Sequence, residues 1–109
     1  MLVDFSAPMG KILPKIDVTG DITKKDLTLI VNGTVVQQSS VSNMIWSIPE
    51  IISILSKSVQ LEEGDLIFTG TPAGVGSIKS GDVLEAHCTD LPSCNFKVIC
   101  DQPNQTCKE

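Results

Sequence analysis

A glycine-rich stretch, residues 69–76, has the residue types best suited to hold a ligand. Glycines at positions 70, 74 and 76 permit a positive φ or a close approach of the backbone to a bound molecule. Thr71 precedes Pro72, which favours an extended backbone, and its hydroxyl can donate a hydrogen bond to a carboxylate. No Walker or dinucleotide-binding fingerprint is present in the stretch. The pattern therefore predicts a ligand loop or, as the plainer alternative, an ordinary tight connection.

The other side chains that could do acid–base or metal chemistry are dispersed. His87 is the only histidine, which disfavours a metal or general-base role against a simple place on a strand. Glu62, Glu63 and Asp65 lie in a polar turn and are most simply solvated. No Glu-x-Glu or Asp-x-Glu pair occurs, and no serine lies in a G-x-S-x-G motif. The residues alone thus predict a ligand loop without catalytic machinery and without a metal site.

Four cysteines occupy positions 88, 94, 100 and 107. Their spacings are wider than the two to four intervening residues typical of zinc ligand pairs. A disulfide framework would need an oxidising compartment, and the sequence carries no sign of one. We expect free structural thiols, with disulfide and metal as the remaining alternatives.

Composition narrows the class of protein. The chain has 109 residues, of which 41% are hydrophobic and 19% charged, and a net charge of −5. An acidic surface disfavours nucleic acid as a partner, since phosphate binding needs clustered lysine and arginine. No apolar run is long enough for a membrane helix, and the first residues do not resemble a signal peptide. We expect a soluble intracellular protein, cytoplasmic or mitochondrial.

Two β-rich runs joined by Asn32-Gly33 predict a hairpin over residues 27–38, because a type I′ turn needs a positive φ at both central positions. The one convincing helix begins at Ser47, which forms an S-x-x-E capping box with Glu50. Isoleucine and leucine at helical spacing then give one apolar stripe as far as Ser58.

Three further strands are expected around the glycine-rich stretch. They are a buried strand at 66–69, a strand at 83–88 and a last strand at 95–100. Residues 1–26 should be irregular, and the polar residues 101–109 should form a frayed tail after a domain spanning 1–100. About five mostly consecutive strands and one helix predict an α+β, mainly β, fold.

Several segments in sequence order resemble the fumarylacetoacetate hydrolase family. They are D-x-x-A-P-M-G at 4–10, V-N-G at 31–33, S-x-M-I-x-S-I-P-x-I-I-x-x-L-S at 42–56, L-x-x-G-D-x-I-x-T-G-T-P-x-G-V-G at 61–76 and K-x-G-D-x-x-E at 79–85. The order and spacing fit with no large gap. The short linkers are similar to those of the small acylpyruvate hydrolase and oxaloacetate decarboxylase branch.

The resemblance implies part of a mixed β-roll with one helix, usually dimeric, from an enzyme that acts on 2-oxo acids. Members hold Mg²⁺, Mn²⁺ or Ca²⁺ through a Glu-x-Glu pair and an Asp, and cleave acylpyruvate-type 2,4-dioxo acids or decarboxylate or isomerise related 2-oxo acids. Those ligands and the catalytic histidine precede residue 4 in the family pattern. We therefore expect a truncated C-terminal part that is inactive alone and holds no metal of its own.

The resemblance carries two substrate contacts and one catalytic candidate to this sequence. Thr71 and Gly70 match the T-G-T-P segment that meets the substrate carboxylate. Glu85 matches the glutamate of the His–Glu pair in long members, with a surface carboxylate as the alternative. The competing class of function is a non-catalytic β-module that reuses the scaffold for protein interaction.

Overall fold

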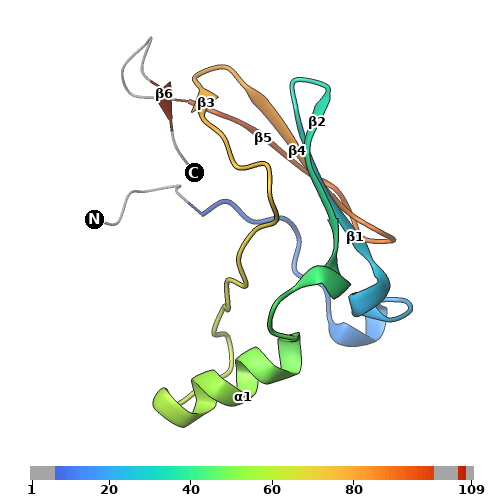
Figure 1. Cartoon of the computed structure of the whole chain (residues 1–109), viewed down its shortest axis with the longest axis vertical. Coiled ribbons are helices and arrows are strands. Elements are labelled where there is room, and N and C mark those ends of the chain that lie inside the picture. Colours follow the sequence, from blue (N-terminus) through green and yellow to red (C-terminus); the bar gives the residue numbers. More distant parts are fainter. Residues whose placement is uncertain (1–6, 100–105, 108–109) are drawn as a thin grey trace.

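A four-stranded antiparallel sheet forms the main body of the fold (Figure 1). The computed structural model describes residues 7–99 and the backbone of residues 106 and 107. The sheet has the order β2-β1-β4-β5, and a second sheet pairs β3 with β6. The strands are β1 (Asp26–Val31), β2 (Thr34–Ser40), β3 (Ile78–Lys79), β4 (Val83–Cys88), β5 (Cys94–Lys97) and β6 (Thr106–Cys107). The predicted α+β class, mainly strand with one α-helix, is confirmed.

The predicted hairpin is present as β1 and β2. Asn32 and Gly33 have φ values of 50° and 83°, as the turn requires. The pairing shifts within the hairpin, because Leu29 lies opposite Gln37 while Ile30 lies opposite Val35. Val36 is left without a partner across the ladder, so β2 carries a bulge at this position.

The hairpin turn is tied to the turn before β4. The side-chain nitrogen of Asn32 donates to Asp82 Oδ1 at 2.9 Å, and the backbone N–H of Val83 donates to Asn32 Oδ1 at 2.9 Å. Asp82 Oδ2 also accepts from the Lys79 amide at 2.8 Å. The Lys79 amide and then the Asn32 side chain stabilise the carboxylate, which lowers the pKa of Asp82 below its usual 3.8.

We expect Asp82 to make stability depend on pH in acid. A carboxylate whose pKa is lower in the folded chain stabilises it above the unfolded pKa of about 4, and this contribution is lost as pH falls through the folded value. The Asp82→Asn variant should unfold at a lower temperature than the parent at neutral pH, and the difference should shrink toward pH 2. Thermal unfolding followed by circular dichroism at several pH values tests this. A difference that stays constant from pH 7 to 2 contradicts it.

Helix α1, Ile48–Ser58, begins as predicted. The Glu50 amide donates to Ser47 Oγ at 3.3 Å, and Pro49 lies in the first turn, where its missing N–H is no loss. The helix lies away from the main sheet (Figure 1), and none of its residues is buried. The apolar stripe therefore gives the helix its amphipathic pattern, but within the described chain it does not pack into a core.

The strand predicted at 66–69 is wrong. The segment has no strand assignment, and Leu66 and Phe68 are 56% and 76% exposed. An apolar run indicates a tendency to be buried but cannot supply the neighbouring strand that a ladder needs, and no described strand accepts this one.

The end of the chain also differs from the prediction. The last strand of the main sheet is Cys94–Lys97. The next residue, Val98, bonds through its backbone to the turn before β4, to the Asp82 carbonyl oxygen and the Gly81 amide. In the predicted frayed tail, β6 pairs with β3 and satisfies backbone groups of that short strand. The domain boundary at residue 100 stays a prediction.

The core of the described chain is small. Val41 and Leu84 are its buried apolar residues, accompanied by the polar Lys25 and Gln37. Many large apolar side chains are exposed instead, among them Ile45 and Trp46 just before α1. Within residues 7–99, no helix is long and apolar enough to cross a membrane.

Candidate functional site

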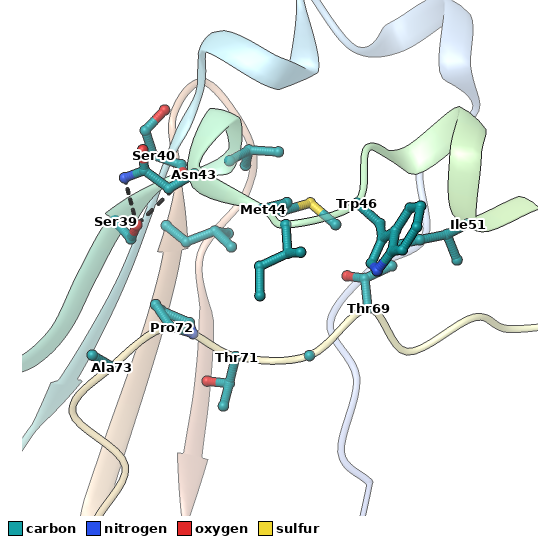
Figure 2. Close-up of a pocket in the computed structure, with 14 residues that line it drawn as sticks. Ser39, Ser40, Asn43, Met44, Trp46, Ile51, Thr69, Thr71, Pro72 and Ala73 are labelled. Carbon is teal, nitrogen blue, oxygen red and sulfur yellow. Dashed lines mark hydrogen bonds between the residues drawn. The ribbon is translucent and has the colours of Figure 1, made fainter.

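The glycine-rich loop forms one wall of a cavity in the described chain (Figure 2). The cavity has a volume of about 510 Å³ and lies between this loop, the end of β2 and the link into α1. The loop contributes a continuous run, residues 69–73. The structure thus brings both sequence-predicted substrate residues, Gly70 and Thr71, to one cavity.

The cavity wall that faces the glycine-rich loop has a polar end and an apolar end. Ser39 and Asn43 stand at one end, where the Asn43 amide nitrogen donates to Ser39 Oγ at 3.1 Å. Met44, Trp46 and Ile51 form an apolar end (Figure 2). A small molecule with a polar head and an apolar tail matches this arrangement, because each part meets groups of its own kind.

The backbone at Gly70 is open to a ligand. Its φ is +95°, and no atom lies within 4 Å of the position that a Cβ would take. Thr71 is exposed, and in Figure 2 its side chain leaves the loop on the side away from Met44. Because Gly70 lines the cavity, a carboxylate bound there could approach its backbone closely.

Gln37 connects the loop to the sheet, and sequence reasoning missed it. Its amide nitrogen donates to Thr71 Oγ1 at 2.8 Å and to the carbonyl oxygen of Pro72 at 2.7 Å. The side chain is buried, with 5% of the residue exposed. Gln37 shares a sheet face with Leu29 only because of the bulge at Val36, so a regular strand pattern in the sequence would not have marked it as inward-facing.

Glu85 lies on the other face of the sheet. Paired residues of an antiparallel ladder share a face, so Leu29, Gln37 and Ala86 face the loop, whereas Glu85 and His87 point the opposite way. Glu85 Oε2 is 3.5 Å from His87 Nε2, and both side chains are partly exposed. The structure does not bring Glu85 to the Gly70–Thr71 cavity, and a catalytic role for it stays a prediction.

The structure describes the side chains of two cysteines. Cys88 and Cys94 are both free thiols. Burial raises the pKa of the Cys88 thiol, and the nearby Lys25 ammonium only partly opposes this effect. A raised pKa lowers the thiolate fraction at neutral pH, so Cys88 is poorly suited to act as a nucleophile.

The described residues do not fit a catalytic metal. Among residues 7–99 no group of three or more His, Cys, Asp or Glu side chains could hold an ion. In the acidic turn, Asp65 Oδ2 already accepts from the Glu62 amide at 2.8 Å. A hard divalent cation needs several fixed oxygen ligands, which this turn does not provide.

Residues 2–99 match the family described as Fumarylacetoacetate (FAA) hydrolase C-terminal. The chain therefore belongs to the fumarylacetoacetate hydrolase family and corresponds to the C-terminal part of its domain. The resemblance stated from the sequence motifs is confirmed.

Curated relatives place the chain among the small members. It is 48% identical over 93 residues to the mitochondrial oxaloacetate tautomerase FAHD1 of Homo sapiens, covering 85% of this chain and 42% of that protein. It is 35% identical over 102 residues to the mitochondrial oxaloacetate decarboxylase of Dictyostelium discoideum, covering 93% and 46%. The chain thus spans less than half the length of these relatives.

A solved structure extends the likeness to three dimensions. Maleylpyruvate hydrolase from Sphingobium sp. SYK-6, in complex with manganese(II) and pyruvate, superposes with a TM-score of 0.76 at 30% identity. The match covers 81% of this chain and 33% of that enzyme. The described chain has a partial fold of the fumarylacetoacetate hydrolase type.

Proposed function

We propose that this chain is the substrate-carboxylate part of an enzyme domain that acts on small 2-oxo acids. The observation that carries the proposal is that Gly70, whose backbone is open, and Thr71 both line one cavity. The named activities of the relatives, an oxaloacetate tautomerase, an oxaloacetate decarboxylase and a maleylpyruvate hydrolase, support this substrate class.

In this proposal Thr71 and Gly70 bind and orient the acid end of the substrate. The Thr71 hydroxyl donates to one carboxylate oxygen, and the exposed backbone at Gly70 lets the other oxygen approach closely. The apolar end of the cavity at Met44 and Trp46 would exclude water from the remainder of the substrate. The choice among C–C hydrolysis, decarboxylation and tautomerisation belongs to residues that the described chain does not contribute.

The family also implies a cation, an oligomeric state and a location for the full domain. The resemblance implies a divalent cation, Mg²⁺, Mn²⁺ or Ca²⁺, and the relative solved with manganese and pyruvate supports this. It also implies a homodimer of the full domain. The mitochondrial relatives support a mitochondrial location, with the cytoplasm as the alternative.

Replacing Thr71 by valine tests the carboxylate contact. Valine keeps the branched shape but removes the hydroxyl, so pyruvate should bind more weakly by about 1–3 kcal/mol, the cost of a lost hydrogen bond to a charged group. Ligand-observed NMR of pyruvate with the 109-residue chain measures this affinity. Thr71→Ser, which keeps the hydroxyl, is the matched control and should bind nearly as the parent does. Equal affinity for the parent and Thr71→Val would reject the assignment.

A further inference from the structure

We propose that Gln37 is a positioning residue that directs the hydrogen of the Thr71 hydroxyl toward the ligand; the inference rests on the proposed function of Thr71. Gln37 does not line the cavity that Gly70 and Thr71 line. It therefore acts through Thr71 and Pro72, the two residues to which its amide nitrogen donates.

The carbonyl oxygen of Pro72 fixes which way the Gln37 amide faces. A carbonyl oxygen can only accept hydrogen bonds, so the amide nitrogen, and not the amide oxygen, must lie 2.7 Å from it. The same nitrogen then faces Thr71 Oγ1 at 2.8 Å. A nitrogen of this kind only donates, so the Thr71 oxygen must be the acceptor in that contact.

The Thr71 hydroxyl hydrogen is consequently left for a ligand. A hydroxyl has one donor hydrogen and two acceptor lone pairs, and Gln37 occupies one of the lone pairs. Within the described chain, the hydroxyl makes no other hydrogen bond. A ligand group that accepts, such as a carboxylate or keto oxygen, is therefore favoured over an ammonium or amide N–H.

The backbone of β2 and the loop holds this contact in place. The bulge at Val36 shifts the register by one residue and places Gln37 on the face of Leu29, toward the loop. On the loop, Gly74 lies directly against β2, because an added Cβ would clash with the Val36 carbonyl oxygen. We call Val36, Gln37 and Gly74 the loop anchor.

Two substitutions of Gln37 test the inference through pyruvate affinity. Gln37→Met keeps a similar length but removes the donor, so nothing then orients Thr71. Gln37→Glu presents acceptors to Thr71, so the hydroxyl hydrogen turns to the new carboxylate and a negative charge is added beside the ligand. Each variant should bind pyruvate at least about tenfold more weakly, the equivalent of one charge-assisted hydrogen bond. Gln38→Glu, the exposed neighbour on the same strand, adds the same charge and should bind as the parent does.

A pH series separates hydrogen-bond polarity from loss of structure. Once protonated, the carboxyl group introduced by Gln37→Glu can again donate to Thr71 or Pro72. This variant should therefore recover pyruvate affinity as pH falls below about 5, while Gln37→Met should not. Pyruvate remains ionised in this range. Far-UV circular dichroism of each variant shows whether the fold is retained.

The outcomes also separate this inference from the proposed function. Parent-like affinity in both Gln37 variants, or an affinity of Gln37→Glu that stays low at every pH, overturns the positioning role. If the parent chain does not bind pyruvate, the proposed function fails. The contact is then judged from the side-chain NMR signal of ¹⁵N-labelled Gln37. A shift of that signal in Thr71→Val supports the contact, and an unchanged signal overturns it.

Discussion

The 109-residue chain by itself is expected to show no turnover of oxaloacetate or of an acylpyruvate, with or without added Mg²⁺ or Mn²⁺. Catalytic divalent cations in proteins need several fixed oxygen ligands to compete with water. The described residues offer no such group, and the acidic turn of Glu62, Glu63 and Asp65 is exposed and partly engaged with its own backbone. Any ion bound there would also lack an oriented position over Thr71.

Calorimetry with each cation, followed by an acylpyruvate cleavage assay, measures this. A full-length maleylpyruvate hydrolase, run under the same conditions, is the positive control. We expect metal binding no stronger than background and no product above the uncatalysed rate. Micromolar metal affinity together with turnover would mean that the chain contains a ligand set which its described residues do not reveal.

Replacing Gly74 by alanine is expected to cause the largest loss of stability among single substitutions in the loop. The new Cβ would clash with the Val36 carbonyl oxygen and lie 3.1 Å from Gln37 Cγ, and the φ of +108° disfavours any side chain. Strain and overpacking together should cost about 2–4 kcal/mol of unfolding free energy. Urea unfolding at constant pH measures the change.

Gly76→Ala is the matched control for this experiment. Gly76 lies two residues along the same loop, no atom stands within 4 Å of its Cβ position, and its φ is not in the positive range. Its replacement should change the unfolding free energy by no more than about 0.5 kcal/mol. Equal changes in unfolding free energy for the two variants would mean that Gly74 does not contact β2 directly.

The local chemistry of two elements was sufficient to predict them from sequence. Asn32-Gly33 specifies its hairpin because few residues tolerate a positive φ at adjacent positions. Ser47 and Pro49 specify the start of α1 because every helix has unpaired N–H groups in its first turn. The Ser47 side chain accepts from one of these groups, and Pro49 has no N–H to leave unpaired. Both patterns act over a few residues and need no distant partner.

The predictions that failed concern features that depend on distant parts of the chain. The run at 66–69 is apolar enough for a strand, but a strand also needs a neighbour, which sequence spacing does not reveal. The apolar stripe of α1 indicated a covered face, whereas no residue of the helix is buried within the described chain. Burial depends on what packs against a segment, and a local pattern predicts only which side would be covered.

The residues of the candidate site also differ in whether a local pattern was sufficient to predict them. Gly70 and Thr71 could be proposed from a contiguous motif, and the structure places both on one cavity. Gln37 could not, because its role depends on the bulge at Val36, and a bulge leaves no fixed mark in a run such as Val-Val-Gln-Gln. The position of Glu85 on the other face of the sheet likewise follows from strand register, which a motif match does not give.

The contact between Gln37 and Thr71 joins residues 34 positions apart and so closes a large loop that contains the whole of α1. The entropy of closing such a loop grows only with the logarithm of its length, by about 0.6 kcal/mol for each doubling. Residues added or removed between Ser58 and Thr69 would therefore cost little, provided that the loop anchor is kept. The geometry at Thr71 is in this sense independent of the length of the segment that carries the helix.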